Sequence, residues 1–168
     1  VTTVPFLMDG DYNLEAEYTD LAGNTAEKVT IDPFTIDMTA PTLEIGGVED
    51  RSANQGEVAP SIVYHDINYN GEATAVSIVG YKNKDGRNLK GSAQENAFGG
   101  SFVCANIEET PENDDIYTCT GYVEDMAGNS SEAELRFSVN RFGSTYMLDG
   151  PTEQLTEKYF TNEVPELH

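Results

Sequence analysis

The side chains most capable of chemistry in this sequence are carboxylates, because 30 Asp and Glu residues stand against nine Lys and Arg residues. Two adjacent pairs, Glu108-Glu109 and Asp114-Asp115, offer the two acids that glycoside hydrolysis requires. Such chemistry needs the pKa values of the two groups to be pushed apart, as an apolar pocket can do. Both pairs fall in a polar loop, so we expect no acid–base catalytic centre.

Nucleophilic catalysis and zinc or phosphate binding have no sequence signature either. His65 is the only histidine away from the C-terminus, and no G-x-S-x-G nucleophile elbow accompanies it. There is no C-x-x-C or Cys/His cluster for zinc. Gly46-Gly47 and Gly99-Gly100 are predicted to be turns rather than phosphate-binding loops. We therefore predict a non-catalytic protein without a cofactor, in which His65 is a solvated residue at the end of a strand.

A net charge of −21 limits the partners of the chain. Phosphate backbones and anionic lipid headgroups are repelled by an acidic surface. No apolar run is long enough to span a bilayer. We therefore expect no binding to nucleic acid and no direct insertion into a membrane. No signal peptide is present, so an export signal is expected upstream if the protein is secreted.

One basic cluster interrupts this acidic sequence, around the turn signal Asp85-Gly86. We interpret the cluster as a solvated turn. The alternative is contact with an acidic partner or with the acidic face of a neighbouring module. Its members are Lys82, Lys84, Arg87 and Lys90.

The strongest pattern in the sequence is an internal repeat. Residues 9–27 (DGDYNLEAEYTDLAGNTAE) align without a gap with residues 114–132 (DDIYTCTGYVEDMAGNSSE). A short segment after each copy also matches: FTID at residues 34–37 follows the first copy, and FSVN at residues 137–140 follows the second. The copies lie about a hundred residues apart, which is the length of one immunoglobulin-like sandwich.

Each copy of the repeat is predicted to be a β-hairpin. Apolar and polar residues alternate after the tyrosine of each copy, as expected for a half-buried strand. In the turn Asp-x-Ala-Gly-Asn, the Asp accepts backbone N–H bonds, the Gly adopts a positive φ, and the Asn tolerates the left-handed region. We assign structural roles to these residues: Tyr12, Asp20, Gly23, Asn24, Tyr117, Asp125, Gly128 and Asn129.

Cys104 and Cys119 are also predicted to be structural, on strands whose alternation can point both side chains inward. An even cysteine count in an extracellular protein is compatible with a disulfide. Leu14 takes the place of Cys119 in the first copy, so the fold does not require a bridge. Buried free thiols pack as small apolar groups, and the two alternatives remain open.

Between the repeats lie the signals of a complete module. Seven short strands separated by turn signals predict an all-β, immunoglobulin-like β-sandwich. The predicted strands are residues 42–45, 58–64, 75–81, 88–92, 101–106, 116–124 and 132–139, and the turn signals are residues 66–71, 84–87, 98–100 and 111–115.

The predicted organisation has three parts. Residues 1–40 are the C-terminal strands of a preceding module, residues 41–140 are a complete sandwich that folds alone, and residues 141–168 are a linker or the start of a following module. Within the last part, residues 144–148 form a candidate strand and residues 154–160 a candidate helical turn. An isolated hairpin is marginal in water. We therefore expect the hairpin of residues 1–40 to borrow a surface from the complete module or from another copy.

The Asp-x-Ala-Gly-Asn hairpins, together with Phe-Thr-Ile-Asp-x-Thr-Ala-Pro at residues 34–41, resemble the tandem bacterial Ig-like domains of Gram-positive cell-surface proteins. The resemblance covers residues 9–140. It implies secretion and location at the cell surface or cell wall of a bacterium. The second junction, residues 140–144, departs from the family pattern because it lacks Ala-Pro. Tyr117, two residues before Cys119, also resembles the tyrosine corner of immunoglobulin domains.

Two functions follow from this resemblance. The first is a non-catalytic structural spacer or stalk whose partners are neighbouring modules. The alternative is an adhesin-type binding module for a host glycan or protein, which exposed aromatic residues on a flat face would favour. The candidates for such a face are Tyr69, Tyr81 and Tyr122.

Calcium is the cation that the many carboxylates could serve. No D-x-D-x-D-G ligand spacing is present. If calcium binds, we expect it near a module junction or at the acidic loop of residues 112–115.

Overall fold

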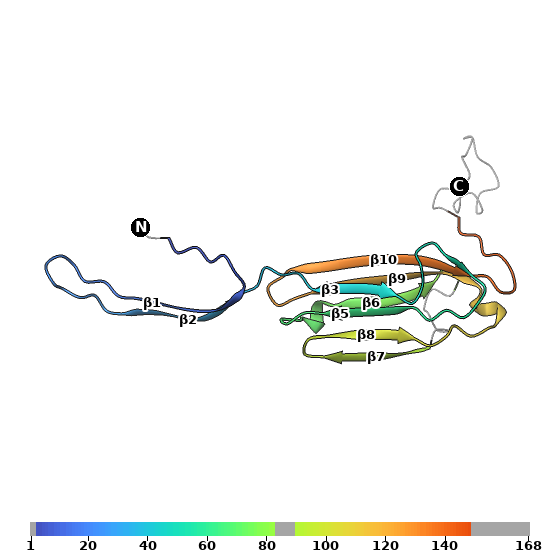
Figure 1. The fold of residues 1–168 in the computed structure, drawn as a ribbon, viewed down its shortest axis with the longest axis horizontal. Helices are drawn as coiled ribbons and strands as arrows, with labels where there is room; N and C mark the ends of the chain where they lie inside the picture. Colours follow the sequence, from blue (N-terminus) through green and yellow to red (C-terminus); the bar gives the residue numbers. More distant parts are fainter. Residues whose placement is uncertain (1–2, 83–89, 149–168) are drawn as a thin grey trace, which may run out of the picture.

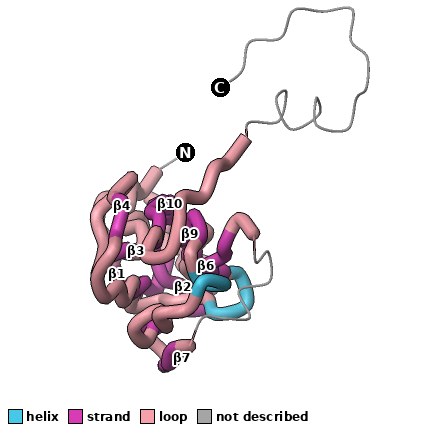
Figure 2. The backbone as a smooth tube through the Cα atoms, turned by 90° about the vertical axis from the view of Figure 1, so that its right-hand side faces the viewer, coloured by secondary structure: helices cyan, strands magenta, loops and turns pink. Residues whose placement is uncertain are grey.

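The computed structural model describes residues 3–82 and 90–148 (Figure 1). Within them the helical residues form only two short 3₁₀ turns, cyan in Figure 2, and no helix is long and apolar enough to cross a membrane. The elements in chain order are β1 (Gly10–Ala16), β2 (Val29–Ile36), β3 (Thr42–Gly46), β4 (Ala53–Asn54), β5 (Ser61–His65), η1 (Gly71–Ala73), β6 (Ala75–Gly80), β7 (Gly91–Asn96), β8 (Gly99–Cys104), η2 (Pro111–Asn113), β9 (Asp115–Glu124) and β10 (Ser130–Val139).

Two four-stranded sheets form a sandwich. One has the order β4-β10-β9-β6 and the other the order β3-β5-β8-β7. The pairs are antiparallel except for the short parallel pair of β4 with β10. Strands β1 and β2 form a separate antiparallel hairpin, which extends from one end of the sandwich (Figure 1). The architecture confirms the prediction of an all-β, immunoglobulin-like β-sandwich.

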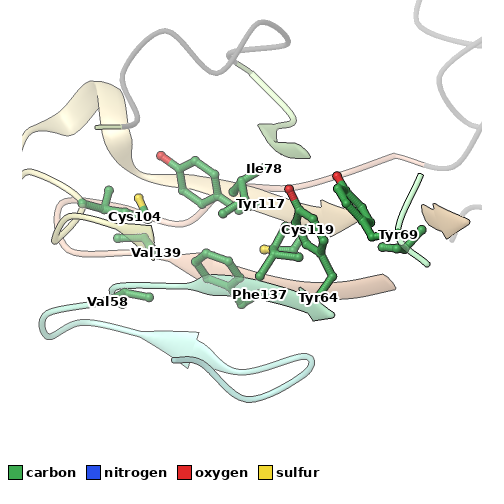
Figure 3. Close-up of a cluster of buried hydrophobic side chains, with 12 residues drawn as sticks. Val58, Tyr64, Tyr69, Ile78, Cys104, Tyr117, Cys119, Phe137 and Val139 are labelled. Carbon is green, nitrogen blue, oxygen red and sulfur yellow. The ribbon is translucent and has the colours of Figure 1, made fainter. Parts of the chain in front are cut away.

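The core of the sandwich follows the alternation of the second repeat. In β9, every second residue from Tyr117 to Val123 is buried, and the residues that alternate with them are exposed or only partly buried. Successive side chains of a strand point to opposite faces, so β9 presents one continuous apolar face. Tyr64 of β5 and Phe137 of β10 belong to the same cluster (Figure 3).

Several predicted strand boundaries were wrong. Strand β4 was missed, because a two-residue strand has no detectable period. Strand β5 begins at Ser61 rather than at residue 58, and β8 runs over Gly99–Cys104 rather than residues 101–106. Residues 144–148 form no strand. The turn at residues 84–87, the first two residues of the predicted strand 88–92 and the helical turn at 154–160 lie outside the described residues.

The prediction that Gly99-Gly100 is a turn was also wrong, because both residues belong to β8. A Cβ atom on Gly99 would lie 2.3 Å from the carbonyl oxygen of Tyr64 in β5. The backbone of Gly99 also has φ +130°, an angle that residues with a side chain rarely adopt. Glycine is therefore needed here for the close approach of two strands, and a pair of glycines alone does not reveal that use.

Cys104 and Cys119 are both buried and free (Figure 3). Burial, together with the neighbouring Cys104, raises the pKa of the Cys119 thiol to about 12. Thiolate is the reactive form of cysteine, and Cys119 is fully buried. We therefore expect maleimide to leave Cys119 unlabelled in the native chain and to label it in denaturant. Rapid native labelling, followed by mass spectrometry, would contradict the register of β9.

Candidate functional site

The two Asp-x-Ala-Gly-Asn turns have the same hydrogen bonds. Asp20 Oδ1 accepts the backbone N–H groups of Ala22 (2.9 Å) and Asn24 (2.8 Å). In the second copy, Asp125 Oδ1 accepts those of Ala127 (2.8 Å) and Asn129 (2.9 Å). Each Asn side chain also donates to its Asp, at 2.9 Å in the first turn and 2.7 Å in the second. The repeated residues thus form two equivalent turns.

The glycines of these turns have left-handed backbones, with φ +90° at Gly23 and +89° at Gly128. An added Cβ would meet nothing within 4 Å at either position, so only backbone strain opposes a larger residue. We expect Gly128→Val to lower the free energy of unfolding by about 1–3 kcal/mol. Ala127→Val, at the exposed neighbouring position, is the matched control and should have little effect in thermal melts. Equal melting of both variants would show that strain at this φ is unimportant.

The predicted tyrosines also occupy equivalent positions. The hydroxyl of Tyr117 donates to the carbonyl of Asn113 at 2.9 Å, and that of Tyr12 donates to the carbonyl of Met8 at 2.8 Å. Both bonds join residues four apart in sequence. They close a corner at the start of β9 and β1, respectively.

The second turn differs from the first because it contacts the linker between hairpin and sandwich. Asn129 Nδ2 donates to the backbone carbonyl of Asp37 at 3.1 Å, and Asn68 Nδ2 donates to the Asp37 carboxylate at 2.5 Å. Ser131 Oγ donates to the carbonyl of Pro41 at 2.6 Å. Three side chains of the sandwich thus hold the linker over residues 37–41.

The same linker is held from the hairpin side by Asp9. Its carboxylate accepts the backbone N–H of Met38 at 2.8 Å and the Thr39 hydroxyl at 2.5 Å. The candidate functional site is therefore this junction, defined by the linker and the side chains bonded to it. Sequence reasoning identified Asn129 as a turn residue only, and it missed Asn68 and Ser131. Their contacts join residues 31 and about 90 positions apart, which local patterns cannot reveal.

Three carboxylates converge beside the linker. Asp37, Asp66 and Asp125 each offer one oxygen, and these oxygens lie within 4.8 Å of one another. Asp66 and Asp125 are buried, with 6% and 1% of their surface exposed. Asp37 and Asp66 of this group also line a hollow of about 450 Å³, together with Asp9, Thr39 and Asn68. A hard divalent cation takes oxygen ligands of this kind.

In the other location that the sequence offered for calcium, residues 112–115, two carboxylates accept backbone N–H groups. Asp114 accepts the backbone N–H groups of Arg141, Phe142 and Gly143 at 2.9, 2.5 and 2.9 Å. Asp115 accepts the backbone N–H of Lys82 at 2.9 Å. Carboxylates bonded in this way are structural supports of the loop.

If calcium binds the described part of this chain, we expect it at the junction, because that is where the oxygens of three carboxylates converge. Millimolar calcium would then raise the Tm of the full chain, because binding to the folded state alone stabilises it. Asp37→Asn, which mimics the Asn140 of the second repeat, would abolish the rise, and Glu112→Gln would keep it. If calorimetry detects no heat of calcium binding and the Tm is unchanged, the prediction of a calcium site at the junction is wrong.

Asp114 occupies in the second repeat the position of Asp9 in the first. Both carboxylates hold the chain that leaves their hairpin, Asp9 through Met38 and Asp114 through Arg141. Burial acts to raise the pKa of Asp114, but the backbone N–H groups and Lys82 outweigh it, so the pKa lies below the ordinary value of 3.8. An ionised Asp114 is therefore part of the folded state.

Of the remaining candidates, His65 lines the hollow at the junction, whereas Lys82 and Lys90 do not. His65 is exposed at the end of β5, where its ring stacks on Phe98 with centroids 6.5 Å apart. In the basic cluster, Lys82 Nζ donates to the carbonyl of Asp114 at 2.7 Å, and Lys90 pairs with Glu108. Lys84 and Arg87 lie outside the described residues.

No protein-family model matches the sequence, and no curated protein matches it. Among solved structures, the GspB Siglec domain is similar, at 15% identity and a TM-score of 0.37. The match covers 69% of this chain and 63% of that chain, less than two thirds of its length. A TM-score this low supports no assignment, so the class of this protein rests on its own topology, a two-sheet sandwich joined to a β-hairpin.

Proposed function

We propose that this chain is a non-catalytic repeat region of a secreted or cell-surface bacterial protein and acts as a structural spacer. The bacterial and extracellular context comes from the family resemblance of residues 9–140. The proposal of a non-catalytic role is supported by the bonding of one of the two candidate acid pairs, because Asp114 and Asp115 accept backbone N–H groups.

One observation carries the spacer role: the linker is fastened on both sides. Asp9 of the hairpin segment and Asn129 of the sandwich bond to adjacent residues of the linker, Met38 and Asp37. A linker with few contacts behaves as a flexible coil, whereas one bonded from both sides holds its neighbours in a preferred orientation. A stalk needs such joints to keep its length.

Two of the three aromatic candidates, Tyr69 and Tyr122, do not favour the adhesin alternative, and the third, Tyr81, is partly buried. Tyr69 is 7% exposed and its hydroxyl bonds to Glu95, so it lies in the core cluster. Tyr122 is 37% exposed and donates to Glu124 at 2.5 Å. Glycan recognition by stacking needs an open aromatic face. Among the described residues these two tyrosines provide no common platform.

The spacer role can be tested by measuring the distribution of distances across the junction. Two spin labels report on this distribution, one at Leu21→Cys on the exposed tip of the hairpin and one at Val63→Cys on an exposed position of β5. Both native cysteines are buried, so the labels attach only to the introduced ones. We expect a narrow distribution in the parent chain and a broad one after Asn129→Ala with Ser131→Ala. Asn54→Ala, which removes bonds to Ser138 and Ser52, is the control and should leave the distribution narrow. A broad distribution in the parent chain would contradict the proposal.

A further inference from the structure

The hairpin β1–β2 has an apolar face that the described residues leave largely open. Ile31 is 47% exposed, Val29 58% and Tyr18 68%. Only one end of the face is covered, where the ring of Phe6 lies 4.8 Å from Tyr12 and 5.3 Å from Phe34. The hairpin extends away from the sandwich (Figure 1). Of the two surfaces expected to cover this face, the complete module is therefore not the one that does so, and the prediction of another copy stays open.

The second repeat shows how the same face looks when it is covered. Tyr12 pairs with Phe34, as Tyr117 pairs with Phe137. The rings of each pair stack, with centroids 5.9 Å apart in the first copy and 5.3 Å in the second. In the second copy Tyr117 is 2% exposed and Phe137 is 1% exposed. The two hairpins thus share this aromatic pair and differ in burial, although β1–β2 has a register shift between Tyr12 and Leu14 that β9–β10 lacks.

The next pair along the strands gives the sharpest contrast. Leu14 pairs with Ile31 in the first copy, and Cys119 pairs with Leu135 in the second. Cys119 is fully buried, and Leu135 packs against the core, whereas nearly half of Ile31 is exposed. Exposed apolar area of this kind marks a surface that binds another one.

The cover of the second hairpin comes from strands on three sides. The sheet β3-β5-β8 lies over its apolar face, with Leu43, Ile62 and Phe102 in the shared cluster. Strand β6 pairs antiparallel with the edge of β9, and β4 pairs parallel with the edge of β10. In the first copy both edges of the hairpin β1–β2 are unpaired among the described residues.

We propose that β1–β2 is the closing hairpin of a second sandwich, completed by a front sheet from the segment of the parent protein that precedes residue 1. That sheet supplies an apolar cover at Leu14 and Ile31. It also supplies an antiparallel strand for the edge of β1 and a short parallel strand for the edge of β2. The inference rests on the proposed function in one respect, which is that the chain belongs to a tandem array.

Charge argues against the alternative occupant, a second copy of this chain. Each copy of the whole chain carries a net charge of −21. Two such copies repel each other. A front sheet in the same chain binds intramolecularly, which raises its effective concentration. Face-to-face hairpins would also leave the strand edges unpaired.

The test compares residues 1–168 with the same chain extended by the preceding hundred or so residues of its parent protein. In each, Ile31→Lys places a charge on the open face, and Thr30→Lys places the same charge on the opposite face as the control. In the extended chain we expect Ile31→Lys to lower the Tm of the first sandwich by at least about 5 °C. In residues 1–168 we expect little change. Leu135→Lys, at the equivalent position of the covered repeat, should lower the Tm of the second sandwich in both chains.

Hydrogen exchange provides a second measurement that does not depend on a variant. Amides of β1 and β2 should exchange at least about tenfold more slowly in the extended chain, because new strands pair with both edges. Unchanged exchange together with equal effects of Ile31→Lys and Thr30→Lys would overturn the proposal. The proposal would also be overturned if the β1 and β2 amides of residues 1–168 were protected from exchange at high protein concentration and lost this protection on dilution. That result would identify a second copy as the occupant. The spin-label distances across the junction test the spacer role separately, so failure of this proposal can be distinguished from failure of the spacer role.

Discussion

Replacing Asp114 with alanine is expected to lower the free energy of unfolding of the sandwich by about 3 kcal/mol. The carboxylate accepts the backbone N–H groups of Arg141, Phe142 and Gly143, and only 4% of the residue is exposed. Each buried donor left without a partner costs about 1–3 kcal/mol, although some of the three donors will reach water. Urea unfolding of the full chain measures the change.

Two matched variants separate the causes of this loss. Asp9→Ala removes the equivalent carboxylate of the first repeat, which has an exposed position, and should cost the sandwich little. Asp114→Asn keeps one acceptor oxygen and should lie between the parent chain and Asp114→Ala. If Asp114→Ala has the same free energy of unfolding in urea as the parent chain, the three backbone bonds do not stabilise the sandwich.

The stability contributed by Asp114 should also depend on pH. Its pKa is lower in the folded state than the ordinary value of 3.8, because the backbone N–H groups favour the ionised form. A group of this kind stabilises the fold fully above its unfolded pKa, and the contribution is lost as the pH falls through the folded pKa. We therefore expect the difference between the parent chain and Asp114→Asn to shrink below about pH 4. A constant difference down to pH 2 would contradict the assignment.

The sequence predicted the parts of the fold that depend on local periodicity. Alternation around Tyr117 and Cys119 predicted a strand with one buried face, and β9 has that face. The internal repeat added the equivalence of β1–β2 with β9–β10, because matched residues imply matched turns. Gly23 and Gly128 share a φ of about +90° for this reason.

The parts that escaped prediction depend on contacts between distant residues. Gly99 required knowledge of the strand beside it, since its glycine is needed only because Tyr64 lies so close. The junction is similar: Asp37, Asp66 and Asp125 come from three separate segments, and only the folded chain brings their oxygens within 4.8 Å. Local patterns define hairpins and turns, whereas joints between modules emerge from the packing of the whole.

The C-terminal boundary of the sandwich leads to the second large effect. The repeat predicts a module that ends at residue 140, but the chain beyond it remains bonded to the sandwich. The Arg141 guanidinium donates to the carbonyls of Ile107 and Gly56, each at 2.7 Å. The Thr145 hydroxyl donates to the carbonyl of Asp114 at 3.2 Å. Residues 141–145 thus hold together the loops at one end of the sandwich.

A fragment of residues 41–148 should therefore melt close to the sandwich in the full chain, because it keeps both sheets and these bonds. Its main losses are the hydrogen bonds of Asn129 and Asn68 to Asp37, each with a net contribution of about 1 kcal/mol. A fragment of residues 41–140 loses the Arg141 contacts and the partners of the Asp114 carboxylate. We expect its Tm to fall by at least about 10 °C, or the fragment to be unfolded at 37 °C. Calorimetry of both fragments measures this difference.

Two results would contradict this account in different ways. If residues 41–140 melt like residues 41–148, the segment after residue 140 is not part of the sandwich, and the boundary predicted from the repeat is correct. If residues 41–148 are unfolded, the boundary at Pro41 is wrong, and the hairpin β1–β2 belongs to the same cooperative unit. Asp114→Ala distinguishes these cases further. It should destabilise residues 41–148 and have little effect on residues 41–140, where the three N–H partners of its carboxylate are already gone.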